Sequence, residues 1–76
     1  MNKLKVEQGY YVFKLEDVIK SKNISINKII KDTNTDFKVL KRIKTGDLVR
    51  IDIFVLARLC NYLDCSMNDI IEYIPR

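Results

Sequence analysis

Apolar residues recur at helical spacing through most of the chain, and the breaks between these runs divide it into five predicted helices. Apolar side chains three and four positions apart lie on one face of a helix. The runs predict helices at residues 15–22, 26–32, 37–44, 53–63 and 67–72. The last four each follow a residue whose side-chain oxygen can accept a hydrogen bond from the first turn, namely Ser25, Asp36, Asp52 and Ser66.

Residues 3–14 follow a different pattern. Residues 3–7 alternate between polar and apolar side chains, and residues 10–13 are Tyr-Tyr-Val-Phe, which are types enriched in strands. Gln8-Gly9 is a candidate turn between them. The segment predicts either a hairpin over 3–14 or a single strand at 10–14 behind a loose arm. Because a two-stranded ribbon is marginal alone in water, it needs cover from the helices, from residues 72–74 or from a second subunit. Pairing within the chain and pairing across a dimer therefore both stay open.

Residues 25–46 form a unit of two short predicted helices joined by a tight break. The break, residues 32–35, is Asp-Thr-Asn-Thr, whose side chains bond nearby backbone groups and favour turns. Gly46 is a natural end for the second helix, since glycine adopts the left-handed conformation without steric cost.

This spacing resembles the helix-turn-helix of the Cro and lambda-repressor-like family. Ser25 opens the motif and Ile29 fills its first apolar position. Leu40 and Ile43 fill the last two apolar positions, and Gly46 ends the recognition helix. The resemblance covers nearly the whole chain. It implies an all-α fold, a five-helix lambda-repressor-like DNA-binding domain with a short N-terminal β-strand or hairpin, formed as a single domain by residues 1–76.

Several positions depart from the family's pattern. Ile30 replaces a small Ala, so the two helices are expected to cross further apart or to shift. Asn34 replaces the usual turn Gly, a mild change because Asn tolerates positive φ. Ile26 stands where a Gln often anchors a phosphate. Phe37 occupies a position that commonly reads a base, but it could instead turn inward to replace bulk lost at Thr35.

The charge distribution agrees with a polyanion-binding surface. The formal net charge is +4. Residues 20–50 carry nine Lys or Arg against three Asp, whereas residues 51–76 are net negative. The excess positive charge therefore lies on the two-helix unit and its flanks, which is the electrostatic pattern of a nucleic-acid binder.

Composition argues against other classes of function. The chain has no His and two Gly, so it lacks the common general base near neutral pH and a phosphate-cradling loop. Its two cysteines, Cys60 and Cys65, are too few for a zinc site and are expected to be reduced and to pack as small hydrophobes. We expect no enzyme activity, no metal and no cofactor. No apolar run approaches a membrane span and the N-terminus has no secretory pattern, so we expect a cytoplasmic protein.

By resemblance, the second helix of the motif enters the major groove of duplex DNA, led by its N-terminal residues. Its outward side chains are the expected base contacts, Phe37, Lys38, Lys41 and Arg42. The expected phosphate contacts lie on the rim, at Asn27, Lys28, Lys44, Thr45 and Arg50. Aromatic residues off the predicted core stripe are candidates for a dimer interface or for packing under the N-terminal strands, namely Tyr10, Tyr11, Phe54, Tyr62 and Tyr73.

Together these features predict a sequence-specific, double-stranded DNA-binding transcriptional regulator, more often a repressor in families of this shape, acting as a homodimer. An antitoxin or mobile-element repressor is the alternative in the same class. A protein-interaction module on the same fold, without DNA binding, is the alternative in a different class, and Ile26 and Phe37 are the features that favour it.

Overall fold

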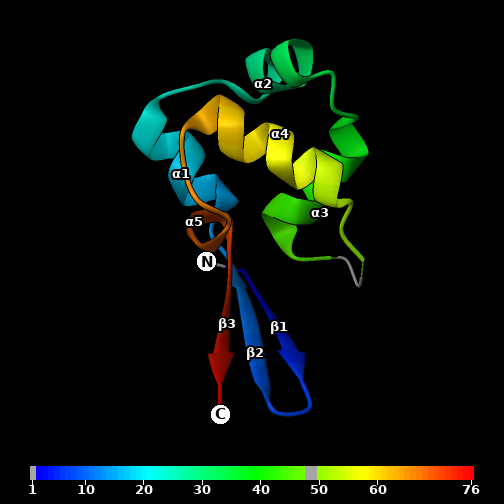
Figure 1. Ribbon diagram of the computed structural model, residues 1–76, viewed down its shortest axis with the longest axis vertical. Helices are drawn as coiled ribbons and strands as arrows, with labels where there is room; N and C mark the ends of the chain where they lie inside the picture. The colour runs from blue at the N-terminus through cyan, green and yellow to red at the C-terminus, as the bar shows by residue number, and fades with distance from the viewer. Residues whose placement is uncertain (1, 48–49) are drawn as a thin grey trace.

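The computed structural model describes residues 2–47 and 50–76, and over these it contains five helices and a three-stranded antiparallel sheet (Figure 1). The helices are α1 (Leu15–Lys22), α2 (Ile26–Thr33), α3 (Phe37–Thr45), α4 (Ile53–Leu63) and α5 (Met67–Ile70). The strands are β1 (Asn2–Val6), β2 (Gly9–Phe13) and β3 (Ile71–Pro75). The bounds of α1 and α4 are those the sequence predicts, and α2 and α3 are each one residue longer. The extended link expected at residues 48–51 includes residues 48 and 49, which lie outside the described residues.

Three of the four predicted cap residues are confirmed by a side-chain hydrogen bond, whereas at Ser66 it is the backbone amide that donates, to the Asp69 carboxylate at 3.0 Å. The Ser25 hydroxyl accepts from the Lys28 amide at 3.1 Å, and the Asp36 carboxylate accepts from the Lys38 amide at 2.7 Å. Asp52 accepts from the amide of Phe54 at 2.8 Å. Each bond satisfies one of the N–H groups that have no partner within the first turn.

The fold prediction is confirmed in part: the five helices and the N-terminal hairpin form, but the end of the chain adds a third strand that an all-α fold did not include. The fifth helix was expected to run to residue 72, but α5 ends at Ile70 and residues 71–75 pair with β2. Ile71, Tyr73 and Ile74 are β-branched or aromatic, so they fit a pleated surface better than a helix of this length. The N-terminal hairpin forms within the chain, with β2 in the centre and Leu4, Tyr11 and Tyr73 side by side across the three strands.

Gly9 has a different role from the one expected. The turn is made by Glu7 and Gln8, and Gly9 is the first residue of β2. A Cβ on Gly9 would collide with the carbonyl oxygen of Ile74 and would lie 2.9 Å from the Pro75 Cα. Glycine is therefore required here because β3 approaches closely, and it lets the third strand join the hairpin.

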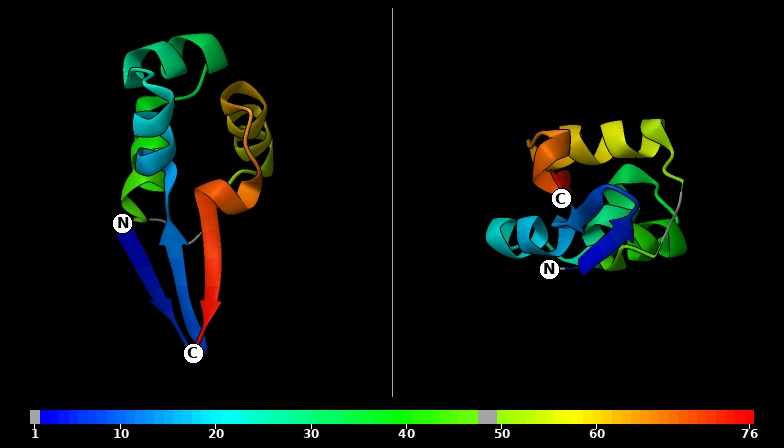
Figure 2. Two further views of the ribbon diagram at one scale, coloured as in Figure 1. Left: turned by 90° about the vertical axis from the view of Figure 1, so that its left-hand side faces the viewer. Right: turned by 90° about the horizontal axis from the view of Figure 1, so that it is seen from below.

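The core lies among the helices. Leu15, Ile29, Leu40 and Leu59 are each fully buried, one from each of the first four helices. The helices gather at one end of the long axis of the molecule and the sheet projects from the other end, as Figure 1 and the left view of Figure 2 show. The junction is sealed by Phe13, which is 4% exposed, and by a hydrogen bond from the Lys14 amide to the Ile70 carbonyl at 2.7 Å. In the described part of the chain, no helix has the length and apolar character needed to cross a membrane.

Candidate nucleic-acid interface

The inner side of α3 anchors this helix in the core. Leu40 and Ile43 are 0% and 1% exposed. Asp36 fixes the start of the helix, and the amide of Gly46, at φ 79°, donates to the Arg42 carbonyl at its end. Because both ends and the inner side are held, the outward side chains of α3 are presented from a rigid element.

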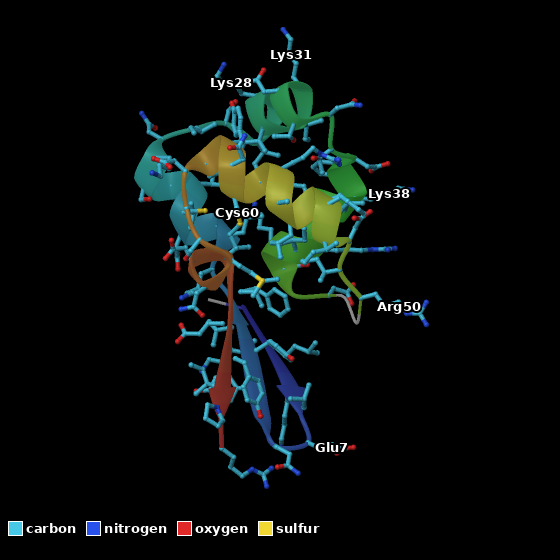
Figure 3. All side chains as sticks on the ribbon, in the orientation of Figure 1. Glu7, Lys28, Lys31, Lys38, Arg50 and Cys60 are labelled. Carbon is cyan, nitrogen blue, oxygen red and sulfur yellow. The ribbon has the colours of Figure 1, made fainter. Side chains whose placement is uncertain are left out.

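The four expected base-contacting residues all lie on the solvent side of α3. Lys38, Lys41 and Arg42 are exposed, and Phe37 is 54% exposed. Phe37 therefore does not turn inward to fill space near Thr35. Figure 3 shows Lys38 pointing away from the body of the protein. Lys38 and Lys41 are three residues apart, so they project from neighbouring positions on one side of the helix. Lysines can donate to guanine O6 and N7 in the major groove.

Two threonines of the predicted break hold the turn between α2 and α3. Thr33 and Thr35 are buried, at 6% and 3% exposure, and their hydroxyl oxygens are 2.7 Å apart. The Thr33 hydroxyl donates to the Ile29 carbonyl at 2.6 Å. Asn34, between them, adopts φ 52°, the positive value that the sequence analysis expected it to tolerate. The turn is therefore set by a hydroxyl pair, and the tendency of Thr to bond the carbonyl four residues earlier was the available signal.

A charged network extends from the start of α2 to α4. The Lys28 ammonium lies 3.2 Å from the Asp32 carboxylate, and the Tyr62 hydroxyl donates to the same carboxylate at 2.6 Å. Asn27, beside Lys28, is exposed. The hydrogen bond from Tyr62, followed by that from Lys28, lowers the pKa of Asp32, and the bond to Asp32 raises the pKa of Tyr62. The Lys28 ammonium is thus paired with the Asp32 carboxylate, one turn further along α2.

We expect the Tyr62→Phe substitution to raise the pKa of Asp32, because it removes the largest cause of the lowered value. A carboxyl group whose pKa is lower in the folded than in the unfolded state stabilises the fold above the unfolded pKa. This contribution is lost as the pH falls through the folded pKa. The acid-dependent loss of stability due to Asp32 should therefore be smaller in Tyr62→Phe. An NMR titration of the Asp32 carboxyl carbon measures both effects. The matched control is Tyr73→Phe, and equal Asp32 pKa values in the two variants would contradict the network.

The three expected phosphate contacts at and after the end of α3 differ in their exposure and hydrogen bonding. The Thr45 hydroxyl donates to the Lys41 carbonyl at 2.9 Å, so its proton is already used within the helix. Lys44 is half-buried, whereas Arg50 is exposed and points outward in Figure 3. Arg42 and Arg50 both line a hollow of about 670 Å³ beside the end of α3. Of these three residues, Arg50 is the one whose side chain is exposed and points outward, so it is the most accessible to a backbone phosphate.

The aromatic residues proposed for a dimer interface fall into different places. Tyr62 is bonded to Asp32 within the chain, and Phe54 is 73% exposed at the start of α4. Tyr11 and Tyr73 pair across β2 and β3, with ring centroids 5.2 Å apart. Tyr10 lies on the opposite side of β2, where the Lys3 ammonium is 5.2 Å from the centre of its ring. The five residues therefore do not form one surface.

Comparison with known proteins agrees with this geometry. Residues 14–76 match the family described as the Cro/C1-type HTH DNA-binding domain. No curated protein and no solved structure matches the chain. The match includes all five helices and β3 and begins after the N-terminal hairpin. The protein therefore belongs to the Cro/C1-type helix-turn-helix family of DNA-binding domains.

Proposed function

We propose that this protein is a sequence-specific transcriptional regulator that binds double-stranded DNA as a homodimer and represses by occupying its site. The main observation in support of the proposal is that α3 has one buried side and one exposed, basic side. Its inner residues, Leu40 and Ile43, are fully buried, while Lys38 and Lys41 face solvent. A B-DNA major groove, about 12 Å wide, admits one such helix.

The basic residues around α3 support binding with the outer side of this helix turned toward the DNA. Lys28 and Lys31 on α2 and Lys38 on α3 point away from the helical body in Figure 3. Basic side chains flanking a recognition helix contact phosphates and fix its register without selecting sequence. Two subunits would place two α3 helices in half-sites about 34 Å apart, one turn of the duplex. Occupation of such a site blocks polymerase sterically.

The exposed Phe37 favours a second candidate, a protein-interaction module on the same fold. A half-exposed aromatic side chain at the start of α3 fits a protein partner as well as a thymine methyl group. The salt dependence of binding to DNA separates the two candidates, because only a phosphate-binding protein releases counterions from the duplex.

We expect the logarithm of the DNA association constant to fall linearly with the logarithm of salt concentration. The slope should be about −0.9 for each phosphate neutralised, and so about −3.6 if about four cations of a single subunit engage and about −7 if both subunits of a dimer do so. Fluorescence anisotropy with a labelled duplex between 50 and 300 mM salt gives this slope. A flat response would exclude the DNA-binding proposal and favour the interaction module.

A further inference from the structure

The end of α4 brings the two cysteines of the chain together. Cys60 lies in the last turn of α4, and Cys65 follows the left-handed residue Asp64, which has φ 52°. The Cys65 amide donates to the Cys60 carbonyl at 3.0 Å. A hydrogen bond across five residues at the end of a helix closes a Schellman motif, in which the side chains at its two ends commonly meet. The ending of α4 therefore directs the two cysteine side chains toward each other.

The two thiols are in contact, between the core and solvent. The thiol of Cys65 shares a hydrogen bond with that of Cys60. Both side chains are half-buried and pack against the core. Two cysteines can be bridged without movement of the backbone only when their Cα atoms lie within about 7 Å. A pair whose backbones are already joined by a hydrogen bond is therefore well suited to forming a disulfide.

Solvent reaches Cys65 through a hollow of about 380 Å³. The hollow is lined by residues of α1, of α5 and of the turn before α5, and its charged lining residues are Lys14, Asp17, Lys22, Asp64 and Asp69. Burial, followed by the charges of Cys60 and Asp69, raises the pKa of the Cys65 thiol against the opposing effect of Lys22. The resting state at neutral pH is therefore a pair of thiols that a small neutral oxidant can reach.

We propose that Cys60 and Cys65 are an oxidation site, which hydrogen peroxide converts reversibly into an internal disulfide. One thiolate attacks a peroxide oxygen and keeps it as a sulfenic acid, while the other oxygen takes up the proton of that thiol and leaves as water. The second sulfur then attacks the sulfenic sulfur, and its proton leaves with the hydroxyl group as a second water. Two thiols and one peroxide thus give one disulfide and two waters. A small dithiol restores both thiols by thiol–disulfide exchange.

The disulfide would cross-link the corner between α4 and α5. Cys65 directly precedes Ser66, the cap residue of α5, and α5 continues into β3 without a linker. The cross-link also restricts the unfolded chain, which raises stability. Figure 3 places Cys60 on the side of the helical body away from Lys38 and Arg50. The outer side of α3 therefore stays accessible in both forms, so oxidation is separate from the proposed DNA binding.

The first test identifies the product of oxidation. The wild-type protein is treated with hydrogen peroxide at about pH 8, where more of the thiols are ionised, and its mass is measured. The expected product is a monomer that lacks two hydrogen atoms and regains them with dithiothreitol. Chains linked to each other, added oxygen without an internal disulfide, or unchanged thiols would overturn the proposal.

The second test measures how well the fold holds the two thiols together. The matched control is Cys60→Ser combined with Asn61→Cys, which keeps two cysteines but moves one to an exposed position of α4. In glutathione redox buffers, the equilibrium constant for forming the internal disulfide should be at least tenfold larger for the wild-type protein than for the control. The wild-type constant should also fall at least tenfold in guanidinium, which unfolds the chain. Equal constants for folded and unfolded wild-type protein would overturn the proposal, whether or not the control folds.

Stability and DNA affinity give the third test. Because the fold favours the disulfide, the disulfide stabilises the fold by the same factor, and the melting temperature of the oxidised protein should be about 5–15 °C higher. The affinity for a selected duplex should differ by less than about twofold between the two forms, since the cysteines lie away from the exposed side of α3. A lower melting temperature after oxidation, or DNA binding lost on oxidation and regained with dithiothreitol, would contradict a cross-link confined to the α4–α5 corner.

Discussion

Replacing both Lys38 and Lys41 with Ala should weaken binding to a selected duplex by about 30-fold or more, with almost no change in the melting temperature. Each good contact to a base edge contributes about 1–3 kcal/mol, so the loss of both should reach at least about 2 kcal/mol. Both side chains are exposed, and Leu40 and Ile43 hold the helix from its inner side. Stability should therefore depend little on the two lysines. Isothermal titration or anisotropy gives the affinity, and thermal denaturation followed by circular dichroism gives the stability.

The matched control is the double substitution Lys20→Ala and Lys22→Ala on α1, which removes the same charge from exposed positions. It should weaken binding only through the general loss of positive charge, and so by less than about tenfold at physiological salt. Equal losses for the two double variants would mean that α3 contributes charge alone. A large fall in melting temperature for the α3 variant would mean that Lys38 and Lys41 are structural.

Gly46→Ala should destabilise the protein by about 2–5 kcal/mol. Gly46 adopts φ 79°, a conformation that costs an L-residue about 1–2 kcal/mol. Its Cβ would also lie 2.8 Å from the Phe13 ring, which is itself buried at the base of the sheet, and overpacking adds about 1–3 kcal/mol. At about 4–8 °C per kcal/mol for a domain of this size, the melting temperature should fall by about 10 °C or more.

Two further variants separate the causes of this loss. Thr45→Ala, one residue earlier on the exposed side of α3, should cost less than about 1 kcal/mol because it removes a single exposed hydrogen bond. Phe13→Leu combined with Gly46→Ala should recover part of the loss relative to the sum of the single variants, since a smaller side chain relieves the clash. Strict additivity of the two substitutions would show that backbone strain at residue 46 is the sole cause.

The helices could be predicted from the sequence because each has local signals that agree. For α3, the Asp36 cap, the apolar pair Leu40 and Ile43, and the terminal Gly46 all specify one helix, whose observed end is one residue beyond the predicted one. The end of the chain could not be predicted in this way. Residues 71–75 follow a short helix directly, and their strand pairing depends on β2, which lies about sixty residues earlier in the sequence. Gly9, which permits that pairing, is indistinguishable from a turn glycine when the partner strand is unknown.

For the candidate site, the sequence likewise predicts features that depend on one helix, but not contacts between residues far apart in the chain. Exposure of Lys38, Lys41 and Arg42 follows from helical periodicity, which places them opposite the buried positions. The hydrogen bond from Tyr62 to Asp32 joins residues thirty positions apart, so periodicity gives no sign of it, whereas Lys28 and Asp32 are an i,i+4 pair within α2. The division of the aromatic residues between two faces of a sheet likewise required the register of three strands.

The most direct test of the central claim, that α3 reads bases in duplex DNA, is a change of sequence preference at one residue. Duplexes bound by the wild-type protein and by Lys41→Gln are selected from a random pool and sequenced. Lysine donates to guanine, whereas glutamine pairs with adenine N6 and N7. The account predicts an enriched motif for each protein, differing at one position in each half-site, with guanine in the wild-type motif and adenine in that of the variant. Identical motifs, or no enrichment by the wild-type protein, would contradict it.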